Sequence, residues 1–130
     1  MPYDPLFSLR TTVKTRVPYV PYEKIAAHIL GGRFSLSVLI CADTLAGQLN
    51  KKYRQKSYSP NVLSFPYSKI DGEIILNVRK AEREARAMGI PLKKRLALLF
   101  VHGCFHLKGH LHGRTMEGLE EKVLRDFKLL

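Results

Sequence analysis

The run Val101-His-Gly-Cys-Phe-His-Leu-Lys-Gly-His-Leu-His112 decides the fold that we expect for this 130-residue chain. His102 and His106 are four residues apart, a step of about 400° on an α-helix, so their imidazoles leave the same face one turn apart. Gly109 can end that helix in a left-handed cap, after which the chain turns back and delivers His112. We therefore expect a helix that carries two histidines on one face and is followed by a third.

Three neutral imidazoles that converge in this way form a facial site that leaves one metal position open for water. Zinc is the expected ion, although imidazole also suits nickel, copper and iron. An open position predicts a catalytic site, because structural zinc is normally closed by four protein ligands. His110 is an alternative third ligand, whereas Cys104 lies about 160° from the mean ligand direction and is not expected to bind. The competing interpretation is a helix face on which each histidine has an ordinary core role.

Length and composition predict one domain, which we place at residues 1–130. Apolar residues make up 45% of the chain, enough for an ordinary hydrophobic core. Cys41 and Cys104 lie within apolar runs, which indicates buried thiols in a reducing compartment. The chain opens without the segments of a signal peptide, and its longest apolar stretch, Leu96 to Val101, is too short to span a membrane. We expect a soluble, cytoplasmic protein that binds no membrane.

The charge balance points to a polyanionic partner. Lys and Arg number 22 against 11 Asp and Glu, a formal net charge of +11. Such an excess most often serves nucleic acid binding, although it can also serve solubility alone. Tyr53 and Tyr58 are interleaved with one basic cluster, as in proteins that stack and hold single-stranded nucleic acid. The RNA-binding candidates in this cluster are Lys51, Lys52, Arg54 and Lys56. A second cluster has the mixed charges of a solvated helix face, and its basic members are Arg79, Lys80, Arg83 and Arg86.

Hydrophobic periodicity predicts an α/β (α+β) fold, a single domain with a small mixed sheet of about four strands and about five helices. The expected strands are Phe7–Val17, Phe34–Cys41, Asn61–Tyr67 and Glu73–Leu76. The last two should form a hairpin, with Asp71-Gly72 as the turn signal. The expected helices are Tyr22–Leu30, one capped by Asp43, one that Asn77 caps and Gly89 ends, one that opens at Pro91, and roughly Thr115–Phe127. The metal site is expected on the penultimate helix.

The histidine run resembles the signature of the YbeY family of metal-dependent, single-strand-specific endoribonucleases, usually His-Gly-x-x-His-Leu-x-Gly-Tyr-Asp-His. The matching residues here are His102-Gly103, His106-Leu107, Gly109 and His112. Two positions before the last histidine differ, because His110 replaces Tyr and Leu111 replaces Asp. A carboxylate at 111 could hold an adjacent histidine by a hydrogen bond or orient water, so in this chain that support must come from elsewhere.

A second, separate segment supports the resemblance. Leu49-Asn50, Tyr53-Arg54 and Asn61-Val-Leu-Ser-Phe-Pro66 resemble the family's Leu-Asn…Tyr-Arg…Thr-Asn/Asp-Val-Leu-Ser-Phe-Pro block, with Pro60 where Thr is usual. Gly72-Glu73-Ile74 resembles the family's Gly-Asp/Glu-Ile strand. These motifs follow the family's order over most of the chain.

The resemblance implies a zinc endoribonuclease that acts on single-stranded ribosomal RNA in ribosome biogenesis, with the small ribosomal subunit rather than DNA as partner. It implies that His102, His106 and His112 hold one Zn²⁺, and that Arg54 faces the same cleft. Zinc lowers the pKa of bound water toward about 7, which supplies a nucleophile for attack on phosphorus. A guanidinium presents a planar, permanently charged fork that suits phosphate oxygens. The expected catalytic residues are therefore Arg54 and His102.

Two other functions fit parts of the sequence. The histidine spacing is also that of metzincin proteases, but Gly103 occupies the position of the Glu that those enzymes use as general base. A basic, ribosome-associated RNA-binding protein with a structural or non-catalytic metal also fits, because Leu111 replaces the usual Asp. Asn61 and Ser64 are further candidates for the cleft, and the motif itself contains no evident general base.

Overall fold

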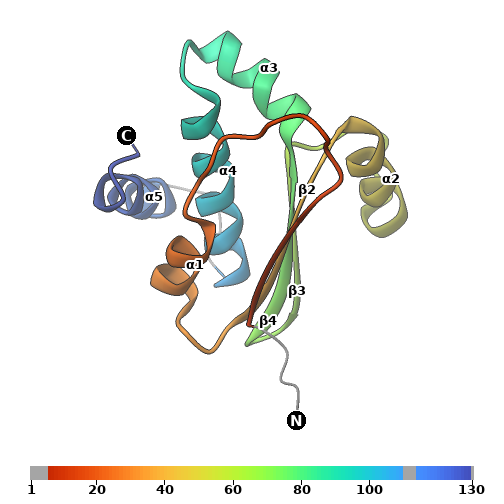
Figure 1. Cartoon of the computed structure of the whole chain (residues 1–130). Helices are drawn as coiled ribbons and strands as arrows, with labels where there is room; N and C mark the ends of the chain where they lie inside the picture. Colours follow the sequence, from red (N-terminus) through yellow and green to blue (C-terminus); the bar gives the residue numbers. More distant parts are fainter. Residues whose placement is uncertain (1–5, 110–113, 130) are drawn as a thin grey trace.

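The computed structural model describes residues 6–109 and 114–129, which form one four-stranded sheet and five helices (Figure 1). The strands are β1 (Phe7–Thr11), β2 (Ser35–Cys41), β3 (Val62–Ser68) and β4 (Asp71–Asn77). The helices are α1 (Tyr22–Leu30), α2 (Asp43–Arg54), α3 (Val78–Met88), α4 (Leu92–Leu107) and α5 (Arg114–Asp126). The predicted fold class and the predicted numbers of strands and helices are confirmed.

The sheet is mixed, with the strand order β1-β2-β4-β3. β1 and β4 both run parallel to β2, whereas β3 runs antiparallel to β4 and forms one edge of the sheet. Alternate residues of each strand face opposite sides. Val38 and Ile74 belong to the larger core beneath α1 and α4, and Leu39 and Ile75 belong to a smaller core that includes Ala46 of α2. The sheet is thus packed on both faces, with α2 alone among the described helices on its second face (Figure 1).

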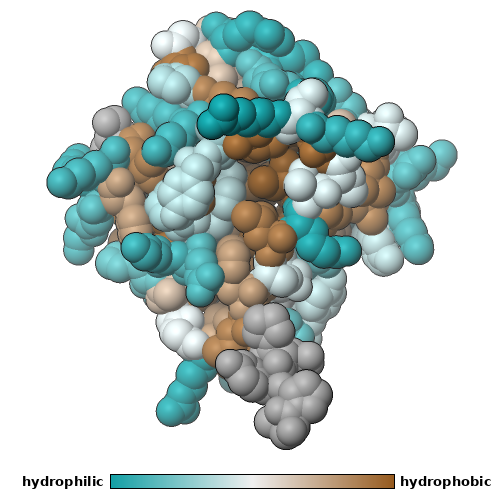
Figure 2. Space-filling view, in the orientation of Figure 1, coloured by the Kyte–Doolittle hydropathy of each residue, from teal (hydrophilic) through white to brown (hydrophobic). Residues whose placement is uncertain are grey.

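Helix α4 is the central element of the larger core. Its buried residues occur on nearly all sides of the helix, which is typical of a helix surrounded by other elements. It packs against the sheet and against α1, α3 and α5. His102 and His106 are only partly buried, although most of their neighbours in the second half of the helix are buried. Away from the core the surface is largely hydrophilic, with apolar patches near the middle of the face shown in Figure 2.

Most predicted boundaries agree with the structure within a residue or two, and three predictions were wrong. The first strand ends at Thr11 rather than Val17. Its neighbour β2 ends at Cys41, so the residues after Thr11 have little of β2 left for backbone hydrogen bonds. The hairpin turns at residues 69–70, where the Ile70 amide donates to Ser68 Oγ, and Asp71-Gly72 lies inside β4. Asp43 does not cap α2, since its carboxylate accepts from two side chains of other elements instead.

Two further predictions concern the cysteines and the caps of α3. Cys41 and Cys104 are buried free thiols, as expected. Asn77 caps α3 by accepting from the Lys80 amide, and Gly89 ends that helix with a φ of 69°. Among residues 6–109 and 114–129, no helix combines the length and apolar character needed to cross a membrane.

Candidate functional site

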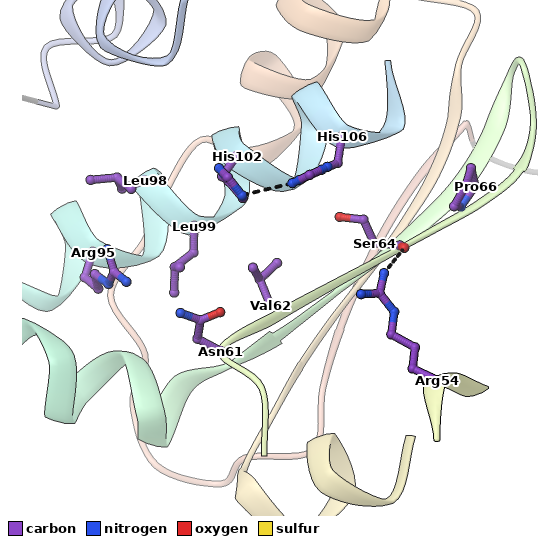
Figure 3. Close-up of a pocket in the computed structure, with 10 residues that line it drawn as sticks. All are labelled: Arg54, Asn61, Val62, Ser64, Pro66, Arg95, Leu98, Leu99, His102 and His106. Atoms are coloured by element: carbon purple, nitrogen blue, oxygen red, sulfur yellow. Dashed lines mark hydrogen bonds between the residues drawn. The ribbon is translucent and has the colours of Figure 1, made fainter. Parts of the chain in front are cut away.

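The ring nitrogens of His102 and His106 converge on one point beside α4. Their Nε2 atoms are 3.0 Å apart, and the ring planes are inclined by 76° (Figure 3). Two nitrogens bound to one tetrahedral zinc at about 2.0–2.1 Å would be separated by about 3.3 Å. The pair therefore has nearly the spacing that a shared metal ion requires, and the i, i+4 prediction for the pair is confirmed.

The third predicted ligand, His112, lies outside the described residues, as do His110 and Leu111. Within the described part of the chain, no group of three or more His, Cys, Asp or Glu side chains is placed to hold a metal ion. Gly109 does adopt the left-handed conformation, with a φ of 97°, directly after the end of α4. Cys104 is fully buried, and burial raises the pKa of its thiol, so it is no ligand candidate.

Glu120 of α5 holds the other side of the first histidine. Its Oε2 atom lies 2.6 Å from His102 Nδ1, and the side chain is buried. A carboxylate at Nδ1 favours the tautomer that carries its proton there, which leaves Nε2 as the electron-pair donor toward the cleft. Glu120 thus supplies a carboxylate behind one histidine of the pair, in a chain whose motif has Leu at position 111. Its signal in the sequence is a carboxylate on the apolar face of α5, four residues after Met116.

A cleft of about 640 Å³ separates α4 from the edge strand β3, and both histidines open into it (Figure 3). Ser64 Oγ donates to the Gly103 carbonyl at 3.2 Å, which ties β3 to α4 beside the histidine pair. A Cβ atom at Gly103 would lie 3.0 Å from Ser64 Oγ and 3.2 Å from Ile74 Cδ1. The position that carries the general base in metzincin proteases is thus closely packed here. The lining residues are Arg54, Asn61, Val62, Ser64, Pro66, Arg95, Leu98, Leu99, His102 and His106.

Arg54 lies on the opposite wall of this cleft from the histidines. It is the last residue of α2, and its Nη2 donates to the Ser64 carbonyl at 3.1 Å. Its guanidinium also lies 5.8 Å from the centre of the Phe65 ring. Two contacts therefore hold a cation at the rim of the cleft, where the family resemblance placed it. Lys51, Lys52 and Lys56 are exposed nearby and are not among the described residues that line the cleft.

Arg95 is a cleft residue that the motif search missed. It lies seven residues before His102, close to two helical turns, so it shares the same face of α4. Its Nε and Nη2 both donate to Glu84 Oε1, at 3.0 and 2.9 Å. Asn61 Nδ2 also donates to the Glu84 carboxylate, so both neighbours of the cleft are fixed by one acid of α3. The helical spacing of Arg95 and His102 was the available signal.

Three residues of the second basic cluster bond to neighbouring groups, and none of its four members lines the cleft. Arg79 donates to Glu82 and Thr15, and Lys80 donates to the Ser59 carbonyl. Arg83 makes a two-point pair with Asp43, and the hydrogen bonds from Arg83 and Asn77 lower the pKa of Asp43 to about 2. These contacts join α3 to α2 and the adjacent loops.

The family model described as Endoribonuclease YbeY matches residues 8–128. The chain belongs to the YbeY family. A YbeY endoribonuclease of Aquifex aeolicus is 37% identical over 114 residues, which cover 82% of this chain and 75% of that protein. One from Thiobacillus denitrificans is 38% identical over 94 residues, covering 65% of this chain and 64% of that protein.

A solved structure shows the same fold as this YbeY family member. The solution structure of a Thermotoga maritima protein superposes with a TM-score of 0.64 over 94% of this chain and 91% of that one. The two sequences are 19% identical, so this likeness concerns the fold. The resemblance inferred from the two sequence motifs is therefore confirmed at the level of family and fold.

Proposed function

We propose that this YbeY family member is a metal-dependent endoribonuclease that cleaves single-stranded ribosomal RNA in the maturation of the small ribosomal subunit. The observation that carries the proposal is the cleft itself, in which two converging imidazoles face a fixed guanidinium across a space of about 640 Å³. The relatives named above carry the name endoribonuclease, which supports the same activity here.

In this proposal His102, His106 and His112 hold one metal ion, with zinc as the expected element. The donor set fits, because two imidazoles already converge and a third histidine follows the left-handed Gly109. Bound there, zinc supplies a Lewis acid and lowers the pKa of water at the site. His102 is counted as catalytic as well as ligating, since it is the histidine whose far nitrogen a buried carboxylate holds.

The role of Glu120 is to position His102. A hydrogen bond of 2.6 Å to Nδ1 keeps the ring from rotating and keeps Nε2 beside His106 Nε2, 3.0 Å away. Glu120 lies behind the histidine and does not line the cleft, so it acts through His102 rather than on RNA.

The role of Arg54 is to bind the phosphate that is cleaved. Its contact with the Ser64 carbonyl uses Nη2 and fixes the plane of the guanidinium at the cleft rim. A planar fork can bind two phosphate oxygens and stabilise the charge that develops during cleavage.

The exposed residues Lys51, Lys52 and Lys56 on the same segment would bind the flanking phosphates. A chain of net charge +11 that acts on RNA fits a cytoplasmic protein.

The proposal is tested by cleavage of an end-labelled single-stranded RNA with identically prepared wild type and His106→Ala. We expect cleavage by the wild type alone, because the variant loses one of two converging ligands. His28→Ala is the matched control, since His28 is an exposed histidine of α1 outside the cleft, and it should cleave normally. RNA that is bound but cut by none of the three proteins would refute the nuclease and favour an RNA-binding protein whose metal is structural.

A further inference from the structure

The second face of the sheet is only partly covered. Helix α2 lies over the end of the sheet that leads into α3, whereas the β3–β4 turn is at the other end (Figure 1). The small core beneath α2 contains Leu39, Cys41, Ala46, Leu63 and Ile75. Beyond it, toward the turn, the sheet carries a hollow of about 370 Å³ with aromatic walls. Leu45, Leu49 and Tyr53 of α2 form one wall of this hollow, and the sheet forms the other.

Three aromatic rings form what we call the aromatic shelf, namely Tyr53, Phe65 and Tyr67. Tyr53 and Tyr67 are 57% and 62% exposed, and the Tyr53 ring meets the Phe65 ring edge to face at 5.7 Å. The register of β3 on β4 shifts between Pro66 and Ser68, so Tyr67 is the extra residue of a β-bulge. Such bulges often redirect a side chain beside a functional site.

The tyrosine of the bulge is held in place without losing its exposure. Tyr67 Oη donates to Glu73 Oε1 at 2.8 Å. The phenol is neutral at its ordinary pKa of 10, and partial desolvation together with this bond to Glu73 raises that pKa to about 12. Single exposed rings are common on protein surfaces, but here two exposed tyrosines and Phe65 line one hollow, and grouped apolar surface of this kind often marks a binding site.

Arg54 connects the aromatic shelf with the cleft. Successive residues of a strand point to opposite faces, so Ser64 faces α4 while Phe65 faces the shelf. Arg54 contacts both of these residues, the Ser64 carbonyl at 3.1 Å and the Phe65 ring at 5.8 Å. The aromatic shelf and the cleft therefore lie on opposite faces of the edge strand β3, and Arg54 contacts residues on both faces.

We propose that the aromatic shelf binds an unstacked nucleobase of the RNA strand whose backbone passes Arg54 into the cleft. The inference rests on the proposed function. Aromatic side chains on an open sheet face bind single-stranded bases by stacking, and nearby cations hold the phosphates. Lys52 and Arg10 add positive charge at this face, since Lys52 Nζ lies 5.2 Å from the Tyr53 ring and Arg10 lines the hollow. A paired base could not reach the shelf, which gives a physical cause for a single-strand requirement.

The test is a binding measurement with a short fluorescein-labelled single-stranded oligoribonucleotide and with the same sequence as a duplex. The protein carries His106→Ala so that the RNA stays intact, and further carries Tyr67→Ala, Tyr67→Phe or Tyr19→Ala. Tyr19 is the matched control, because it is 73% exposed and outside the shelf and the cleft. We expect Tyr67→Ala to weaken single-strand binding roughly tenfold, and Tyr67→Phe and Tyr19→Ala to leave it unchanged. Duplex binding should be insensitive to all three.

Equal single-strand affinity with and without the Tyr67 ring would overturn the shelf. So would a Tyr67→Ala variant that keeps its RNA affinity but sediments as a smaller species, since the face would then join two copies of the chain. Failure of the nuclease is a separate result, namely RNA that binds through Tyr67 but is not cut by the wild type. Normal cleavage with no effect of Tyr67→Ala on binding would refute the shelf alone.

Discussion

Glu120 Oε2 lies 2.6 Å from His102 Nδ1, although the two residues are on different helices and eighteen positions apart. The contact attaches α5 to the histidine that faces the cleft. Because a hydrogen bond at Nδ1 selects the tautomer whose electron pair is on Nε2, α5 takes part in the chemistry of the site as well as in the core.

We predict that Glu120→Ala weakens zinc binding by roughly 10- to 100-fold, the usual cost of losing a carboxylate behind a histidine ligand. Competition with a coloured chelator measures the affinity without reference to RNA. Glu120→Gln should fall between Ala and wild type, since an amide oxygen still accepts from Nδ1. Glu121→Ala is the control on the exposed side of α5. Wild-type zinc affinity in Glu120→Ala would remove the positioning role.

Arg54→Ala should retain its metal and cleave slowly. The guanidinium contacts the Ser64 carbonyl and the Phe65 ring but neither histidine, so zinc content should match the wild type. Loss of a preorganised donor at the developing charge predicts a decrease of roughly 100-fold in single-turnover cleavage. Arg54→Lys should recover little, because an ammonium cannot form the two-point contact. Arg86→Ala, an exposed change on α3, is the control. Zinc loss in Arg54→Ala would contradict the assigned role.

A methyl group at Gly103 should disturb the close packing of α4 against β3. The added Cβ would lie 3.0 Å from Ser64 Oγ and 3.2 Å from Ile74 Cδ1, so crowding should cost about 1–3 kcal/mol and outweigh the gain of about 0.5–1 kcal/mol that a helical Gly→Ala change brings. Gly118→Ala on α5 is the matched control, because nothing lies within 4 Å of its Cβ and a helical Gly→Ala change stabilises by about 0.5–1 kcal/mol. Urea unfolding measures both, and equal midpoints for the two variants would show that the close packing at Gly103 has no energetic weight.

The pair between Asp43 and Arg83 should make stability depend on acidic pH. The folded pKa of Asp43 is about 2 and the ordinary value is 3.8, so the stabilisation is fully present above about pH 4 and disappears as the pH falls toward 2. Arg83→Ala should raise the pKa of Asp43 toward its ordinary value and reduce this dependence. Both side chains are considerably exposed, so the effect should be small and sensitive to salt. Carboxyl-detected NMR titration reports it directly, and an unchanged Asp43 pKa in Arg83→Ala would assign the shift to Asn77 instead.

The parts of the site that depend on local spacing could be predicted from the sequence. The step from His102 to His106 fixes a shared helix face, and Gly109 marks the helix end by a conformation that few other residues adopt. Arg54 was placed at the cleft by the resemblance of its motif to the YbeY family, because a separation of ten positions from Ser64 gives no distance by itself.

The remaining features depend on contacts between distant segments. Glu120 reaches His102 only because α5 packs on α4, and helical periodicity gives no information about that crossing. Asp43 has the residue type of a helix cap, yet Arg83 and Asn77 compete successfully for its carboxylate. The aromatic shelf depends on the bulge at Tyr67, just before the turn at residues 69–70. The Asp71-Gly72 signal predicted a turn two residues later, so the bulge could not be predicted from it.

The most direct test of the account is removal and return of the metal in a single preparation of the wild type. A chelator should abolish cleavage of single-stranded RNA, and one equivalent of zinc should restore it, whereas the same treatment of His106→Ala should restore nothing. Cleavage that continues in the metal-free wild type, with the chelator shown to have removed the ion, would contradict a metal-dependent site at the histidine pair.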